Sequence, residues 1–373
     1  MSMTPYERVM TTLRREQPDR VPIFEFMIDP KVINGILPGG SYVDLVEALD
    51  IDCVVTPTPS RMYNLHVVEE LADGTPIYQS DWGERRAANV EMVTIPVVHP
   101  IKTHADWEAY QMPDPDRPER LAYLRDLVAR FKGRRAIGFH THDSFSYPSY
   151  LFGMTDLFVG MIDEPEWVQE VVGACNAHCV RLVELAVKAG ADFVMFGDDL
   201  GGKSGPMMSP RHYQRFFLAG LVRVVEKAHE LGARVIKHTD GNVTQLLDMF
   251  AEAKIDAFHP SDPAAGMDIA EVKRRYGDRF AVCGGIDTGE TLSWWPVSQL
   301  VAEVRRRIEQ LAPGGGWMIA SSNTVHSSVR PENYQALVRA TQTYGNYSCL
   351  NQPISAELEA SIGKVPLRPA LGG

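Results

Sequence analysis

Short apolar runs alternate along the chain with longer stretches in which apolar and polar positions follow a helical period. A strand buried on both faces of a parallel sheet has a nearly continuous apolar sequence, whereas a helix covering that sheet is apolar on one side only. The pattern predicts eight buried strands, at 20–27, 52–58, 134–143, 192–199, 234–240, 257–262, 280–287 and 317–323.

Most of the intervening stretches are typical of amphipathic helices. A helix near the N-terminus has a capping box, with Thr4 as N-cap, Pro5 at the first helical position and Glu7 three residues after the cap, and it ends before Pro18. Apolar spacing of three and four residues predicts further helices at about 162–190, 209–231, 243–253, 268–276, 297–311 and 331–344.

Eight strands that alternate with helices favour an α/β fold of the TIM-barrel type, a single (β/α)8 barrel over residues 1–347 with an N-terminal helix. Residues 59–125 are longer and less regular, and we expect an antiparallel hairpin that elaborates the second loop. Residues 348–373 are expected to form a separate C-terminal tail. A doubly wound open sheet is the alternative, but no GxGxxG follows the first strand.

The composition of the chain argues against some classes of ligand and some cellular locations. Lys and Arg number 37 against 48 Asp and Glu, a net charge of −11, which argues against nucleic acid as the main ligand. The N-terminus is charged where a signal peptide is apolar, and no run is long enough for a membrane span. Five irregularly spaced cysteines suggest reduced thiols and a cytoplasmic protein. Cys175 and Cys179 share a helix face, where packed thiols are favoured over metal ligands.

Polar residues cluster where the apolar runs end. In a barrel this is the catalytic mouth, because all strands point their carboxyl ends the same way. We assign one group of these residues to substrate binding: Glu25, Asp29, His140, Tyr147, Asp199 and Asn323.

Three segments carry the chemistry most directly. In "KHTDGN", His238 and Asp240 lie two apart and face the same way, which suits either two ligands of one metal ion or a histidine held by its carboxylate; a simple strand-end turn is the alternative. In "FGDDLGG", Asp198 and Asp199 face opposite ways, so we expect one to touch substrate while the other fixes the loop.

The third segment is "HTHD", which puts His140 and His142 on one face of a strand. They are either a metal pair, an acid–base pair near neutral pH, or packing residues against Tyr147 and Tyr150.

These motifs make the chain similar to the uroporphyrinogen decarboxylase / cobalamin-dependent methyltransferase superfamily over about residues 4–345. The resemblance rests on "PDRVPI", "FGDDLGGKSGPMMSP", "KHTDGN", "GGIDTGETL" and "PGGGWMIASSNTVHSSVRPENY". It implies a (β/α)8 barrel with its site at the carboxyl ends of the strands, and a homodimer.

Two differences from the motifs of the superfamily indicate which of its branches this chain resembles. Decarboxylases carry an arginine-rich "MRQAGR"-like segment after the first strand, but this chain has the acidic "EFMIDPKVING", which would repel a polycarboxylate. The methyltransferase branch holds zinc with a His-x-Cys pair and a later cysteine. Here the pair is His238 and Asp240, and no cysteine stands near Asn323. A carboxylate makes a harder site, suited to an oxygen-bearing substrate such as a methyl ether or phenol.

The resemblance therefore predicts a methyltransferase that moves a methyl group between a small substrate and a corrinoid protein. Zinc or another divalent metal is held by His238 and Asp240, with His326 or a water, and acts as a Lewis acid. Asp198 or His142 orients the substrate or moves a proton. No corrinoid-binding segment is visible, so cobalamin is expected on a separate protein.

Two other hypotheses about the function are also compatible with the sequence. One is a metal-assisted or acid–base decarboxylase or lyase acting on a small, non-porphyrin acid, with Asp198 and His142 as its central pair. The other is a non-catalytic barrel that serves as a partner subunit, for which the missing cysteine ligands are the main support.

Overall fold

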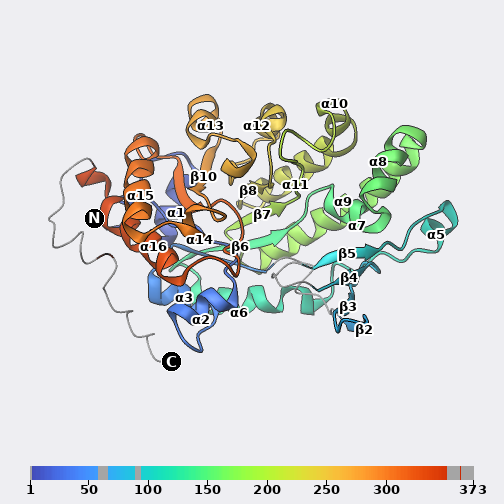
Figure 1. Ribbon diagram of the computed structural model, residues 1–373. Coiled ribbons are helices and arrows are strands. Elements are labelled where there is room, and N and C mark those ends of the chain that lie inside the picture. The colour runs from blue at the N-terminus through green and yellow to red at the C-terminus, as the bar shows by residue number, and fades with distance from the viewer. Residues whose placement is uncertain (1, 58–65, 89–93, 351–361, 363–373) are drawn as a thin grey trace.

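A parallel sheet of seven strands forms the centre of the computed structural model, which describes residues 2–57, 66–88, 94–350 and 362 (Figure 1). The sheet is curled, and its order is β1-β6-β7-β8-β9-β10-β11 with every neighbouring pair parallel. The strands are β1 Cys53–Val55, β6 Ala136–Thr141, β7 Phe193–Gly197, β8 Arg234–His238, β9 Ala257–His259, β10 Ala281–Ile286 and β11 Trp317–Ser321. Each coincides with a predicted apolar run, which confirms the α/β class.

The first apolar run, 20–27, differs from its prediction. It makes isolated parallel bridges, Ile23 with Ile319 and Ile28 with Val325, and no regular strand is assigned to it among the described residues. The Phe24 amide donates to the Ile319 carbonyl at 2.9 Å and the Asp52 amide to the Ile23 carbonyl at 3.2 Å, so the run lies between β11 and the start of β1. Pro22 has no N–H to donate, and the Phe26 amide donates to Glu25 Oε1 at 3.3 Å instead of to β11, so the ladder is interrupted on both sides of Ile23. The eight-stranded form of the prediction is therefore not confirmed.

The interior of the curled sheet is filled by alternate residues of the strands. The side chains packed there come from the strands, from the 20–27 run and from the first helix; they include Phe24, Phe26, Cys53, Phe193, Met195, Ile236, Ala257, Cys283 and Met318. A larger cluster lies outside the sheet, under the helices. Because side chains alternate along a strand, the residue two beyond Ile236 or Ala257 also points inward, and both are histidines.

Helices cover the outside of the sheet (Figure 1). They are α1 Pro5–Leu13, α2 Pro30–Ile36, α3 Tyr42–Leu49, α5 His104–Ala109, α6 Ala122–Phe131, α7 Ser146–Phe152, α8 Met154–Asp163, α9 Pro165–Ala189, α10 Pro210–Tyr213, α11 Ala219–Glu230, α12 Leu247–Glu252, α13 Ile269–Tyr276, α14 Thr291–Trp294, α15 Val297–Leu311 and α16 Pro331–Tyr344. The capping box of Thr4 and Glu7 is present. No helix in the described ranges is both long and apolar enough to cross a bilayer.

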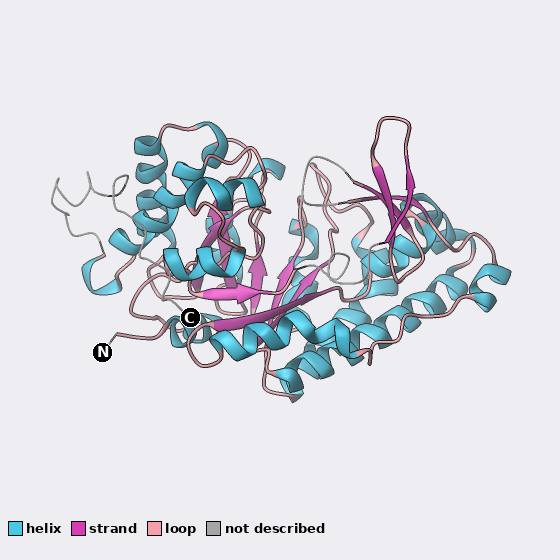
Figure 2. Cartoon of the chain, turned by 90° about the horizontal axis from the view of Figure 1, so that it is seen from below, coloured by secondary structure: helices cyan, strands magenta, loops and turns pink. Residues whose placement is uncertain are grey.

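An antiparallel sheet of four strands replaces the simple hairpin expected in the irregular region. Its strands are β2 His66–Glu70, β3 Pro76–Gln79, β4 Arg85–Ala87 and β5 Ile95–Val98, in sequential order. Figure 2 shows this sheet standing apart from the main one. Trp82, in the turn between β3 and β4, stacks on Tyr147 of α7 with ring centroids 3.9 Å apart, which fixes the small sheet to the barrel. Residues 59–65 and most of the predicted tail lie outside the described residues.

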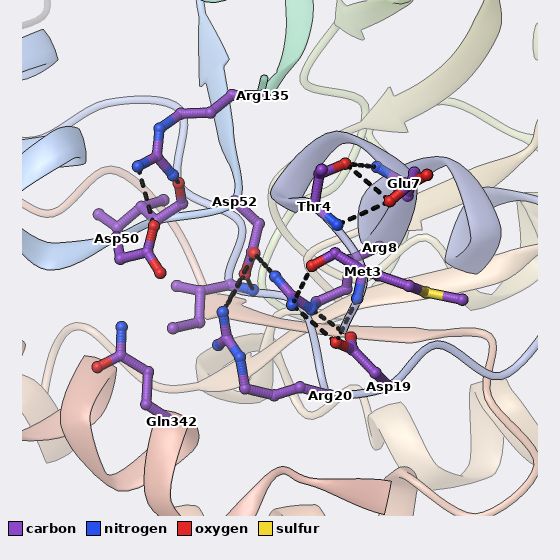
Figure 3. A network of polar contacts seen from close by, with 12 residues as sticks. Met3, Thr4, Glu7, Arg8, Asp19, Arg20, Asp50, Asp52, Arg135 and Gln342 are labelled. Carbon is purple, nitrogen blue, oxygen red and sulfur yellow. Dashed lines mark hydrogen bonds and ion pairs between the residues drawn. The ribbon is translucent and has the colours of Figure 1, made fainter. Parts of the chain in front are cut away.

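A buried polar network lies at the amino ends of the strands (Figure 3). Arg8 of α1 pairs with Asp19 at 2.7 Å and with Asp52, just before β1, at 2.5 Å. Arg20 also reaches Asp52 at 3.2 Å, and the Ile23 amide donates to the same carboxylate at 2.7 Å. Every charge in this network has a partner of opposite sign, so it ties α1, the first apolar run and β1 together without any ligand.

Candidate functional site

Two glycine-containing loops bring the candidate metal ligands together at the carboxyl ends of β7 and β8. The Gly201 amide donates to the Asp240 carbonyl at 3.2 Å, and the Asn242 amide donates to the Gly202 carbonyl at 2.8 Å. A Cβ on Gly201 would lie 2.5 Å from the Asp240 carbonyl oxygen, and Gly241 has φ +77°. Only glycine permits this backbone approach, and the approach sets Asp199 beside Asp240.

Asp199, His238 and Asp240 form a three-residue cluster whose ligand atoms all lie within 4.8 Å of one another. The Nε2 atom of His238 is 3.5 Å from Asp240 Oδ1 and 3.6 Å from Asp199 Oδ1. Within the described ranges it is the sole group of three or more His, Cys, Asp or Glu with this spacing. The structure thus brings the predicted pair together and adds Asp199, which sequence reasoning had assigned to substrate.

A short relay fixes which nitrogen of His238 faces the carboxylates. His259 Nε2 lies 3.2 Å from the Ser321 carbonyl, which only accepts, so this nitrogen carries the proton of a neutral His259. His259 Nδ1 is then an acceptor, and His238 Nδ1, 2.8 Å away, must donate to it. Burial lowers the pKa of both rings, to about 3 for His238, so both are neutral. His238 Nε2 therefore presents a lone pair to Asp199 and Asp240.

The donor set fits a divalent cation. Asp240 Oδ1 is buried without a hydrogen-bond partner, while its Oδ2 accepts from the Asn323 amide at 2.8 Å. Burial and the nearby Asp199 carboxylate raise the pKa of Asp240 well above its usual range, which is the response of an acid that lacks a counter-charge. A neutral imidazole nitrogen with two carboxylate oxygens suits zinc or a harder divalent metal.

Other candidate ligands lie apart from this cluster. His326 accepts from the Ser328 amide at 3.3 Å and is not one of the three clustered residues. Cys175 and Cys179 are buried free thiols on α9, and burial raises the pKa of both, as expected for packed structural cysteines.

Phe26 and His140 line the floor of the mouth beside the cluster. The Phe26 ring contacts His140, His238 and His259, with centroids 5.8, 5.2 and 5.6 Å away. Both ring nitrogens of His140 are buried without a hydrogen-bond partner. A Cβ on Gly197 would lie 2.3 Å from His140 Nε2, so glycine at this strand end makes room for the imidazole. The floor of the site is therefore aromatic and buried.

The adjacent acids Asp198 and Asp199 do face opposite ways. Asp198 is fully buried and accepts from the amides of Asp143 and Ser146, both at 2.6 Å, while Asp199 faces the mouth. Lys237 pairs with Asp143 at 2.6 Å and lies 3.7 Å from Asp198. Although burial opposes it, the Lys237 ammonium and these hydrogen bonds hold the pKa of Asp198 well below its usual range. Asp198 thus anchors the loop after β6.

His142 links this anchor to the aromatic residues of α7. Its Nδ1 lies 2.7 Å from the Gly197 carbonyl and therefore carries the proton of a neutral ring. Its Nε2 is 3.4 Å from the Tyr150 hydroxyl, and Tyr147 packs edge-on against it with centroids 4.9 Å apart. Burial lowers the pKa of His142, so the neutral ring accepts the Tyr150 hydrogen bond.

Two further predicted residues lie at the 20–36 segment. Asp29 is the N-cap of α2, and its Oδ1 accepts from the Lys31 amide at 2.8 Å. Glu25 is buried, accepts from the Ser321 hydroxyl at 2.9 Å, and burial raises its pKa to about 8. Glu25 is therefore protonated at neutral pH.

The sequence places His259, like His238, at the end of an apolar run and so among the polar residues of the mouth, but it assigns no role to His259 or to Lys237. Lys237 gave no such signal, because a lysine next to a site histidine is usually exposed, and only the structure shows its contact with Asp143.

The model of the uroporphyrinogen decarboxylase (URO-D) family matches residues 83–344. The chain belongs to this family. Its curated URO-D relatives include uroporphyrinogen decarboxylases of Thioalkalivibrio sulfidiphilus, 25% identical over 89% of this chain and 96% of the relative, and of Aeromonas salmonicida, 23% identical over 90% and 95%.

A solved structure described as a methyltransferase from Methanosarcina mazei superposes with a TM-score of 0.73. It is 18% identical, and the match covers 92% of this chain and 99% of that one. At this identity the likeness establishes that the two chains share the URO-D fold, and the chemistry has to be argued from the site.

Proposed function

We propose that this URO-D family member is a metal-dependent methyltransferase that moves a methyl group between a small substrate and a corrinoid protein. The observation that carries the proposal is the set of three possible ligand groups, on Asp199, His238 and Asp240, whose ligand atoms lie within 4.8 Å of one another, with Asp240 Oδ1 buried and without a hydrogen-bond partner. With both carboxylates ionised the arrangement is repulsive, and a divalent cation bound among them removes that repulsion.

A divalent metal bound there would supply Lewis acidity to the substrate atom that carries the methyl group. The protein's own residues set the ligand orientation. His259 fixes the His238 tautomer, and the Asn323 amide holds Asp240 Oδ2 so that Oδ1 points toward His238. Outer partners of this kind tune metal affinity.

The donor types favour an oxygen-bearing substrate. A thiolate-free set of one imidazole and two carboxylates is harder than the cysteine-containing site of the methyltransferase branch. When the carbon–oxygen bond breaks, its electron pair stays with oxygen, and that oxygen takes a proton. The Tyr150 hydroxyl, which donates to His142 Nε2 at 3.4 Å, carries such a proton and lines the same cavity as Asp199. Asp198, enclosed by backbone amides, positions the loop that carries His142.

The test combines metal analysis with a methyl-transfer assay. Purified protein is expected to contain about one divalent metal per chain by elemental analysis, and to methylate added cob(I)alamin when supplied with a methyl ether. His238→Ala is expected to lose both the bound metal and the methyl-transfer activity, whereas the matched variant His326→Ala keeps the metal and the activity. Metal-free wild-type protein, or a His238→Ala variant with unchanged activity, would overturn the proposal.

Decarboxylation of a small non-porphyrin acid is the second candidate. Family membership favours it, as does the His142–Asp198 pair, whose Nδ1 and Oδ1 atoms are 3.8 Å apart. Release of carbon dioxide from a substrate acid with no corrinoid present would establish this reaction in place of methyl transfer.

A further inference from the structure

A cavity of about 570 Å³ opens beside the metal-ligand cluster. Its walls come from α7, the start of α8, the last strand of the small sheet and the loop after β7. They include Ile95, Phe145, Tyr150, Phe152, Met154 and Asp199. Asp199 is the one residue shared between this cavity and the cluster, so a ligand in the cavity has one end at the candidate metal.

The lining combines apolar and aromatic side chains with polar ones, and its lysine and histidine already have hydrogen-bond partners. The Lys102 ammonium, the cation on the wall, is bound to Asp156 at 2.7 Å and to the Phe152 carbonyl at 3.3 Å. His99 Nδ1 lies 2.8 Å from the Tyr150 carbonyl. A ligand carboxylate would therefore compete with Asp156 for Lys102 and lie near Asp199, which disfavours anions.

A cationic ligand is disfavoured by a different contact. The Arg86 guanidinium lies 4.7 Å from the centroid of the Tyr150 ring, so the aromatic face that would attract a quaternary ammonium group already has a cation on it. With the Asp199 and Asp240 charges balanced by a divalent metal, the cavity as a whole is close to neutral.

We propose that this cavity binds the neutral aromatic portion of the substrate, with the substrate's oxygen directed at Asp199. The reacting end of this assignment and the neutrality of the cavity rest on the metal of the proposed function, whereas the binding of an aromatic ring does not require methyl transfer. Phe145 and Phe152 line the cavity and are themselves buried among other aromatic rings, so they give it a fixed aromatic wall suited to an apolar ring. Ile95 and Lys102 lie in or just after the small antiparallel sheet, which makes that inserted region the element that sets substrate class.

The test is a binding titration on the full-length, metal-loaded chain with three ring compounds of similar size: methoxybenzene, 4-methoxybenzoate and trimethylphenylammonium. Isothermal titration or saturation-transfer NMR measures the affinity without turnover. Methoxybenzene is expected to bind at least about tenfold more tightly than either charged compound. Equal or tighter binding of the anion or of the cation would overturn the assignment.

Two tryptophan substitutions on α8 locate the binding. Met154→Trp narrows the cavity and is expected to weaken methoxybenzene at least about tenfold, while Ile162→Trp, at a position 69% exposed on the same helix, leaves it within about twofold. Unfolding midpoints verify that both variants fold. If Met154→Trp binds like Ile162→Trp, the cavity is not the site. If selective binding is found but no methyl transfer, the proposed function fails and the cavity assignment stands.

Discussion

The two ends of the curled parallel sheet differ in how their buried charges are paired. At the amino ends of the strands, Arg8 lies between Asp19 and Asp52, and each carboxylate faces a guanidinium. At the carboxyl ends, Asp199 and Asp240 face a histidine lone pair, and the hydrogen bond between them comes from the neutral Asp240 amide, which donates to Asp199 Oδ1 at 3.2 Å. The first arrangement stabilises the fold by itself, whereas the second is favourable only with a cation present. The difference separates residues that hold the barrel from residues that serve a ligand.

The largest effect is expected at the amino end. Arg8→Ala leaves Asp52 buried with Arg20 as its remaining cation, and should lower the free energy of unfolding by about 3 kcal/mol. Urea unfolding measures this loss. Arg14→Ala, which removes an ion pair with Glu16 that is about half exposed, is the matched control and should cost less than about 1 kcal/mol. Equal losses in the two variants would contradict the assigned role of the network.

A bound metal should stabilise the folded protein only through the cluster at the carboxyl ends of the strands. Zinc at about a hundred times its dissociation constant is expected to raise the free energy of unfolding by about 2.7 kcal/mol. The increment should vanish in His238→Ala, because the cluster loses its nitrogen ligand, and persist in folded Arg8→Ala. Unfolding with and without metal, with chelator as the blank, measures it. If the metal failed to stabilise either variant, the ion-pair network at the amino ends of the strands and the cluster at their carboxyl ends would not be independent.

The contribution of the buried Glu25 carboxyl group to the free energy of unfolding depends on pH. Its pKa is raised to about 8 in the folded state from an ordinary value of 4.5, so the folded protein binds the proton more tightly. Stability from this group is full below about pH 4.5 and is lost as pH rises through about 8. Relative to the wild type, Glu25→Gln should gain about 2 kcal/mol between pH 6 and pH 8, read from urea unfolding at both values. A constant difference between the two proteins at both pH values would refute this assignment.

The smallest effect concerns the support of Asp240. Asn323→Ala removes the amide that binds Asp240 Oδ2 and should weaken metal affinity about tenfold by competition with a chromophoric chelator. Asn346→Ala, where the asparagine accepts from the Ser348 amide, is the control and should leave affinity unchanged. Unchanged affinity in both variants would mean that Asp240 needs no support from Asn323.

Much of the architecture could be read from periodicity. Seven apolar runs became parallel strands because burial on both faces requires continuous apolar sequence, and helices such as 297–311 and 331–344 had one apolar stripe each. The 20–27 run failed as a regular strand because Pro22 carries no amide proton. The small sheet gained two strands beyond the expected hairpin, since alternation alone does not count the partners of a strand.

The orientation of His238 and Asp240 toward the same side of a strand end could be predicted from sequence alone, because it depends only on the two-residue period of extended backbone. Tertiary structure decided the rest. Contacts between segments far apart in sequence decide three other features of the site. They decide which of Asp198 and Asp199 faces the mouth and which histidine orients His238. They also decide which residues of the inserted sheet line the cavity. Such contacts follow from strand register and from the way the sheet curls, and local periodicity does not encode either.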